Sequence, residues 1–105
     1  MSEETRFERL VGLQVTDEEG YARYRAGMRP ILAGYGGSFR WDIRGGEVLE
    51  GETDDAINRV FVLSFPSRDA SDRFFIDPDY LAVRAAHFDG SVGAAAIIAE
   101  YDRQL

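Results

Sequence analysis

Four stretches of the chain carry apolar residues in patterns that are typical of β-strands. In the first stretch every second residue from Phe7 to Val15 is apolar except Arg9, which predicts a strand with one buried face. The third stretch is apolar on both faces, so we expect both of its faces to be covered. The four stretches are residues 6–15, 38–43, 58–65 and 93–101.

The second stretch, "SFRWDI", alternates between apolar and polar residues and therefore predicts a strand with one polar face. Its apolar face would consist of Phe39, Trp41 and Ile43, and its polar face of Ser38, Arg40 and Asp42. A polar face of this kind is either solvated or lines a wet site.

Residues 17–35 repeat large apolar side chains at steps of three and four, which predicts a helix. The stripe consists of Tyr21, Tyr24, Met28, Leu32 and Tyr35. Thr16 and Glu19 have the spacing of a capping box, so the helix should begin at Asp17. Pro30 predicts a kink rather than a break, and Gly36 or Gly37 should supply the left-handed residue at its end.

A second helical segment follows the third strand. Ser67 has the position of an N-cap, and the apolar residues behind it are typical of a short helix. Asp77 and Pro78 then form a second start signal, so we expect the helix to break there and restart. The restarted helix should run to Gly90.

The elements follow the order β-α-β-β-α-β. Right-handed crossovers and a central hairpin turn this order into an α+β, ferredoxin-like fold, a four-stranded antiparallel sheet with the helices on one face. The opposite, open face would leave the apolar third strand exposed. We therefore expect a homodimer in which two such sheets pack together as a dimeric α+β barrel.

Composition narrows the class of protein. A chain of 105 residues predicts a single domain over residues 1–105. A net charge of −7 argues against nucleic-acid binding, and no apolar run is long enough to span a membrane. The absence of cysteine and lysine excludes disulfides, thiol nucleophiles and Schiff-base chemistry. With an acidic N-terminus in place of a basic signal sequence, the expected location is the cytoplasm.

Residues 44–56 are rich in glycine and then in carboxylates, which predicts a loop. Carboxylates in a loop without a nearby histidine are usually a solvated surface, so we predict neither a metal site nor a cofactor.

Several motifs, taken together, resemble the bacterial family known as domain of unknown function (DUF) 1330. They are "VTDEEGYARYRAGMRPILAGYGG", "GGEVLEG", "RVFVLSFPSRDASDRFF" and "DPDYLAVRAAHF", in this order. The resemblance covers roughly residues 10–101. It implies the fold of the dimeric α+β barrels, a superfamily that includes cofactor-free monooxygenases, muconolactone-type isomerases and haem-degrading enzymes. The sequence departs from the family pattern at Ser38, where arginine is usual, so a ligand contact by an arginine at that position is lost.

The restarted helix carries the candidate site. At 100° per residue, Tyr80, Arg84 and His87 share one sector with the large apolar side chains, and alanines fill the rest. Either this sector faces the sheet and lines a small pocket, or the alanines pack and the polar residues are solvated. In a pocket, Arg84 would bind an anionic or carbonyl group, and Tyr80 would donate a hydrogen bond. Arg40, Trp41 and Phe65 complete the candidate ligand-binding set.

The pattern leaves three hypotheses about function. The first is a homodimer that binds a small anionic or aromatic molecule without turnover. The second is a cofactor-free enzyme, an isomerase or a monooxygenase-like protein, in which His87 is the catalytic acid or base. The third is a purely structural dimerisation module. Whether the chain is an enzyme stays open at this point.

Overall fold

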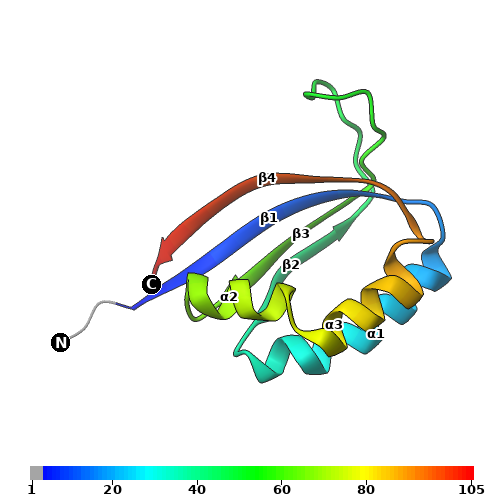
Figure 1. The fold of residues 1–105 in the computed structure, drawn as a ribbon. Coiled ribbons are helices and arrows are strands. Elements are labelled where there is room, and N and C mark those ends of the chain that lie inside the picture. The colour runs from blue at the N-terminus through cyan, green and yellow to red at the C-terminus, as the bar shows by residue number, and fades with distance from the viewer. Residues whose placement is uncertain (1–3) are drawn as a thin grey trace.

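The computed structural model describes residues 4–105 and contains one antiparallel sheet with its helices on one face (Figure 1). The sheet consists of β1 (Thr5–Val15), β2 (Ser38–Arg44), β3 (Arg59–Phe65) and β4 (Val92–Gln104), in the order β2-β3-β1-β4. The helical elements are α1 (Glu18–Gly34), α2 (Arg68–Phe75), α3 (Pro78–Val83) and the π-helical turn η1 (Arg84–Phe88). This arrangement confirms the predicted ferredoxin-like fold.

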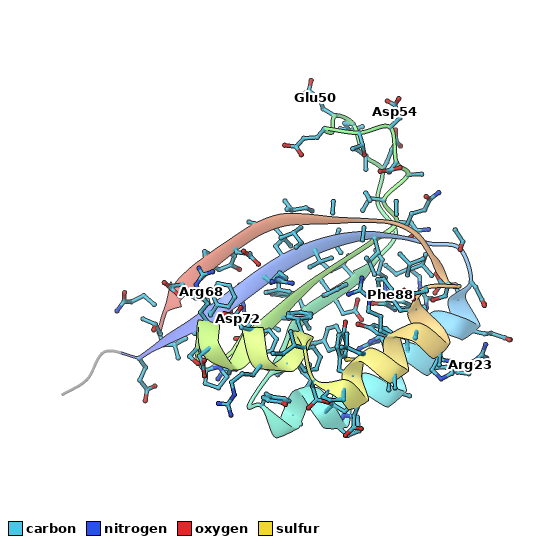
Figure 2. The ribbon with its side chains drawn as sticks, in the orientation of Figure 1. Arg23, Glu50, Asp54, Arg68, Asp72 and Phe88 are labelled. Atoms are coloured by element: carbon cyan, nitrogen blue, oxygen red, sulfur yellow. The ribbon has the colours of Figure 1, made fainter. Side chains whose placement is uncertain are left out.

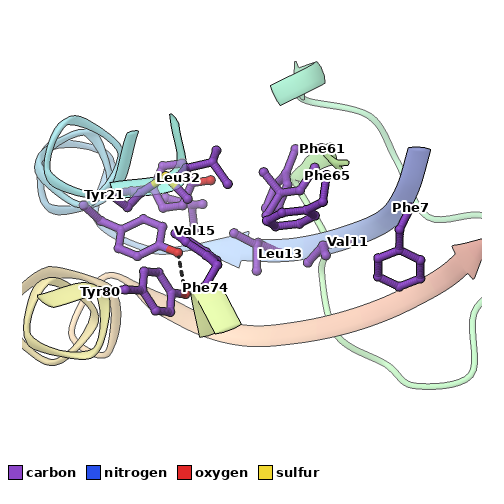
Figure 3. Packing of buried hydrophobic residues seen from close by; sticks show 13 residues of the cluster. Phe7, Val11, Leu13, Val15, Tyr21, Leu32, Phe61, Phe65, Phe74 and Tyr80 are labelled. Carbon is purple, nitrogen blue, oxygen red and sulfur yellow. Dashed lines mark hydrogen bonds between the residues drawn. The ribbon is translucent and has the colours of Figure 1, made fainter. Parts of the chain in front are cut away.

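The hydrophobic core lies between the sheet and the helices (Figure 3). The alternation in β1 is confirmed, because Phe7, Val11, Leu13 and Val15 are all buried on the helix side. Arg9 shares that side and pairs with Glu100 of β4 at 2.7 Å. The α1 stripe is also confirmed, since Tyr21, Tyr24, Met28 and Leu32 are its buried large side chains.

The ends of α1 are formed by local hydrogen bonds. The predicted capping box is wrong by one residue: Asp17 is the N-cap and accepts from the Gly20 amide at 3.1 Å, while the Thr16 hydroxyl donates to the carbonyl of Ser91. The helix runs through Pro30 to Gly34 without interruption. At its end Gly36, with a φ of 75°, adopts the predicted left-handed conformation.

Both start signals of the second helical segment are confirmed. The Ser67 hydroxyl accepts from the Ala70 amide at 3.1 Å, and the Asp77 carboxylate accepts from the amides of Asp79 and Tyr80. The predicted α-helix to Gly90 is wrong beyond Val83, because the chain then forms the π-helical turn η1. Its wider ring is closed by the Asp89 amide, which donates to the carbonyl of Arg84 at 3.2 Å.

The predicted faces of β2 are wrong after Phe39. The pairing with β3 shifts between Phe39 and Trp41, so that a β-bulge lies at Arg40. Phe39 stays on the helix side and packs against Phe61, whereas Trp41 and Ile43 lie on the opposite face of the sheet. The extra residue therefore reverses the alternation that the sequence predicts.

We call the sheet face away from the helices the open face. Its exposed apolar side chains include Trp41 and Ile43, with exposed fractions of 57% and 51%, and Ile98 of β4, with 55%. Leu10, Val60 and Val62 share this face through their register with one another. Trp41, Ile43 and Ile98 are thus left uncovered in a single chain, around the buried Val62.

A loop of residues 45–58 joins β2 to β3 and rises on the side of the sheet opposite the helices (Figure 1). Ile57, near its end, lies over Gly12 on the open face, where an added Cβ would meet Ile57 Cγ2 at 2.9 Å. We call residues 45–58 the acidic loop, since they contain five carboxylates and no basic residue.

The two ends of the described chain meet at one end of the sheet, beyond the first pair of β1 and β4. β4 pairs with β1 over almost its whole length, from Val15 with Val92 to Thr5 with Gln104. Beyond that pair the amide of Leu105 donates to the carbonyl of Glu4 at 3.0 Å. Within residues 4–105 no helix is long and apolar enough to cross a membrane.

Candidate functional site

Tyr80 lies in the aromatic part of the core. The cap at Asp77 begins α3, and this places the Tyr80 ring against Phe74 and Phe75, with centroid distances of 4.3 and 5.7 Å. The Tyr80 hydroxyl forms a buried hydrogen bond of 2.9 Å with the hydroxyl of Tyr24 (Figure 3). The predicted helix face therefore does turn inward at Tyr80.

The two phenol hydroxyls, of Tyr24 and Tyr80, can donate two hydrogen bonds, but the described chain gives them only one acceptor. One hydroxyl donates its proton to the other, and the second proton has no acceptor among residues 4–105. Burial raises the pKa of Tyr24, and the neighbouring Tyr80 raises it further. The Tyr24 hydroxyl thus remains protonated at neutral pH, and one O–H group of the pair has no acceptor within the described chain.

Arg84 lies on the turn after Tyr80, at the surface. Its side chain is 48% exposed and approaches one carboxylate, that of Asp89, at 3.9 Å. The guanidinium also lies over the ring of Phe88, at 5.2 Å from the centroid, and Phe88 in turn packs on Tyr24. The Arg84 guanidinium thus lies on the face of an aromatic ring and makes no hydrogen bond to another residue of the described chain.

His87 is half-buried within η1, and its side chain makes no hydrogen bond to any residue from 4 to 105. The hydrogen bond at this position belongs to the backbone, since the Ser91 hydroxyl donates to the His87 carbonyl at 2.7 Å. The π-helical turn changes the rotation per residue, so a wheel drawn at 100° no longer places His87 relative to Tyr80. The alanines of this helix, Ala82, Ala85 and Ala86, are exposed.

The other predicted ligand contacts are divided between the core and the open face. Phe65 is fully buried beside Phe74 and Phe75, the same rings that contact Tyr80. Trp41 and Arg40 lie on the open face, so the sheet separates them from Tyr80. The structure therefore brings together Tyr80 and Arg84 but does not place Arg40 or Trp41 with them.

A polar cluster on the open face was not among the predicted sites. Glu8 of β1 faces the open side of the sheet and is 0% exposed. Its carboxylate accepts from Arg40 Nε at 3.0 Å, Arg103 Nε at 2.8 Å and the Tyr101 hydroxyl at 2.9 Å. Arg6 lies beside it, bonded through Nε to the Ser64 hydroxyl at 2.8 Å. We call Arg6, Arg40 and Arg103 the arginine cluster.

Two opposing effects act on the Glu8 carboxyl. Burial raises its pKa, but the hydrogen bonds from Tyr101, Arg103, Ser64 and Arg40 lower it by more, so that the pKa of Glu8 lies below its usual value. Glu8 is therefore ionised at neutral pH and balances only one of the three guanidinium charges. The one sequence signal for this cluster is a glutamate within the first predicted strand, at a position that faces away from the core.

A second ionic cluster holds α1 against the sheet. Asp42 of β2 pairs with Arg25 of α1 at 2.9 Å and with Arg59 of β3 at 3.2 Å. Arg59 also reaches Glu18 at the start of α1, at 3.1 Å, and lies over the Tyr21 ring. Asp42 thus holds these two arginines, one on the helix and one on the sheet.

Two surface hollows lie outside the helix–sheet interface. One, of about 690 Å³, is enclosed by the acidic loop and by Gln14 and Val15. The other, of about 430 Å³, lies beside Glu4, Arg6, Pro66 and Leu105. Among residues 4–105 no three histidine or carboxylate side chains come together as metal ligands.

Comparisons with known proteins agree with this fold. The chain belongs to the family described as domain of unknown function (DUF1330), whose model matches residues 10–101. Among solved structures, it is similar to RPA0582 of Rhodopseudomonas palustris, a protein of unknown function, with 20% identity and a TM-score of 0.76 over 97% of this chain and 83% of that one.

Two more distant structures describe the architecture. A dabb family protein with a ferredoxin-like fold from Mesorhizobium loti is 17% identical, with a TM-score of 0.61 over 93% of this chain and 94% of that one. A dimeric protein of unknown function and ferredoxin-like fold from Bacteroides fragilis is 14% identical, with a TM-score of 0.56 over 95% and 96%. A search among curated proteins finds no match. These two structural neighbours agree with the ferredoxin-like fold of this chain.

Proposed function

We propose that the protein acts as a homodimer, joined through the open sheet faces, in which each protomer binds a small anionic molecule beside Arg84. The observation that carries the ligand proposal is that Arg84 is half-exposed and lacks a hydrogen-bonded partner among the described residues. Its guanidinium rests on an aromatic ring. A carboxylate can accept two hydrogen bonds from such a guanidinium.

The surroundings of Arg84 favour an organic anion. Phe88 offers an apolar surface under the guanidinium. A ligand that combines a carboxylate with an apolar or aromatic body would use both features. The π-helical turn that begins at Arg84 supports the choice of this region, because such turns are frequent at functional sites.

The homodimer is supported by the open face. Trp41, Ile43 and Ile98 are each more than half exposed, around a buried Val62. Soluble proteins rarely leave a contiguous apolar surface of this kind uncovered. Packing of two such faces would close the sheets into a barrel with the helices outside.

The dimer is tested by sedimentation of the wild-type protein at micromolar concentration. The expected result is one species of twice the monomer mass of 11.8 kDa. A single species at the monomer mass would overturn the dimer. As a check on the interface, Trp41→Ser and Ile43→Ser should produce monomers that retain their helical circular dichroism.

The ligand site is tested with acetate, succinate and benzoate as probes in a thermal-shift titration. Benzoate should raise the melting temperature of the wild type more than acetate does, since it adds apolar contact to the charge. Arg84→Gln should abolish the shift, whereas Arg73→Gln, at an exposed arginine of α2, should leave it unchanged. Equal shifts in both variants, or none in the wild type at millimolar concentration, would contradict the proposal.

The second candidate function is a cofactor-free enzyme that uses His87 as acid or base. It is favoured by a half-buried imidazole that no residue from 4 to 105 holds by a hydrogen bond, on the same turn as Arg84. If a turned-over ligand is found, His87→Ala should abolish turnover and retain binding. If no probe binds and the dimer is present, the third hypothesis, a dimerisation module, is the one that remains.

A further inference from the structure

We propose that, in the homodimer, the acidic loop of each protomer binds the arginine cluster of its partner. Each strand then runs in the direction opposite to the same strand of the partner. This inference rests on the proposed homodimer. It adds which segments meet and how the protomers are oriented.

The acidic loop has the length, position and charge that such a contact needs. It spans 14 residues without a helix or strand, a length that is uncommon for a loop in a compact domain. It rises beyond the open face, and Glu50 and Asp54 lie at its outer end (Figure 2). Its carboxylates are Glu47, Glu50, Glu52, Asp54 and Asp55.

The arginine cluster carries the complementary charge on the same face. Two of its guanidinium groups, those of Arg40 and Arg103, bind the single carboxylate of Glu8, and the third, that of Arg6, bonds to the neighbouring Ser64, so two of the three positive charges remain unbalanced. Arg40 and Arg103 use Nε to bind Glu8. The terminal nitrogens of Arg103 have no acceptor among residues 4–105 and are available to a partner's carboxylates.

The two charged regions lie at opposite ends of the open face. The arginine cluster surrounds Glu8 near the start of β1, whereas the acidic loop leaves the sheet at Arg59, opposite Leu13. Five residues of β1 separate these points, which corresponds to about 17 Å along the strand. A protomer is therefore positive at one end of its open face and negative at the other.

Charge selects between two ways of pairing the faces. A two-fold axis parallel to the strands would place loop against loop and arginine cluster against arginine cluster. An axis across the strands places each loop against the partner's arginines, twice in the dimer. Like charges in contact are strongly unfavourable and opposite charges fix orientation, so the second arrangement follows.

Disulfide trapping tests the orientation directly, because the chain has no cysteine of its own. Glu50→Cys places a thiol at the tip of the loop, and Ser38→Cys places one beside the arginine cluster, in the row of Ser64 and Glu8. An equal mixture of the two variants should give the mixed disulfide on oxidation. Each variant alone should stay uncrosslinked.

The outcomes separate this inference from the dimer itself. Self-crosslinking of Glu50→Cys alone, or a dimer with no mixed disulfide, would overturn the loop contact and leave the homodimer intact. A wild-type protein that sediments as a monomer would overturn the homodimer as well.

Charge removal provides a second test. Glu50→Gln with Asp54→Asn removes four interfacial charges per dimer and should raise the dimer dissociation constant about tenfold at low salt. The difference should shrink in about 1 M NaCl, where screening is nearly complete. The control, Glu19→Gln with Asp72→Asn, removes the same charge from exposed positions on the helix side. Equal affinity in both variants would overturn the proposal.

Discussion

Replacement of Glu8 by glutamine tests whether the buried carboxylate stabilises the sheet. Glutamine keeps the shape of the side chain but offers one oxygen in place of two. If that oxygen accepts from Arg40 and Tyr101, the amide nitrogen faces Arg103 Nε–H, and two donors meet. The substitution therefore removes one charge-assisted hydrogen bond outright and weakens the others.

The expected loss follows from these contacts. A hydrogen bond to a charged group contributes about 1.5–3 kcal/mol, and unpaired buried charges cost more. Arg40 and Arg103 have side chains that are 33% and 36% exposed, so water can solvate them in the variant and limits the loss. We expect about 3 kcal/mol of the free energy of unfolding to be lost, a fall in melting temperature of roughly 15 °C for a chain of this size.

The assay is urea unfolding at fixed protein concentration, followed by tyrosine and tryptophan fluorescence. Glu100→Gln is the matched control: Glu100 lies on the neighbouring strand and pairs with Arg9 at 2.7 Å, but its side chain is 32% exposed. Loss of that pair should cost less than about 1 kcal/mol.

The dependence on pH supplies a second criterion. The pKa of Glu8 is lowered in the folded state, so its ionisation stabilises the fold at pH values above the ordinary 4.5. That stabilisation is lost as the pH falls through the lower folded-state value. The difference in the free energy of unfolding between wild type and Glu8→Gln should therefore have its full size at pH 7 and become smaller in acid. A difference no larger than that of Glu100→Gln, or one that is constant from pH 7 to pH 3, would refute the reasoning.

Three further predictions concern stability. Tyr80→Phe should cost about 1–2 kcal/mol by urea unfolding because it leaves the Tyr24 hydroxyl buried without its partner; the double variant with Tyr24→Phe should recover part of this loss, and strict additivity would contradict the pairing. Gly36→Ala should destabilise by at least about 1 kcal/mol, since φ is 75° and the new Cβ would lie 2.7 Å from Pro66, whereas Gly34→Ala, in open helix, should stabilise. Asp77→Ala should lower the melting temperature through loss of about 1 kcal/mol of capping, with Asp79→Ala as the milder control.

The fold could be predicted because its signals are local. Alternation in β1, the stripe of α1 and the caps at Ser67 and Asp77 each depend on a few neighbouring residues. Gly36 is predictable for the same reason, since a helix that ends in a left-handed turn favours glycine.

What could not be predicted depends on one inserted residue or on distant partners. The bulge at Arg40 moves Trp41 to the open face, and the π-helical turn after Val83 changes the placement of His87; in both cases a regular period fails after the insertion. Glu8 is a further example. Its partners come from residues 32 to 95 positions away in the sequence, so no local pattern announces its burial.

Glu4 and Leu105 meet at one end of the sheet, so the start of β1 and the end of β4 can be connected without moving a strand. A short glycine-rich linker could join these positions, and the chain could be opened between Glu50 and Gly51, in a loop that belongs to no strand ladder. Such a circular permutant would begin with β3 and end with β2, and would retain every pairing of the sheet. It would also convert the acidic loop into two free tails. The protomer could then fold without the loop contact that we propose for the dimer, so a single variant would distinguish folding from association.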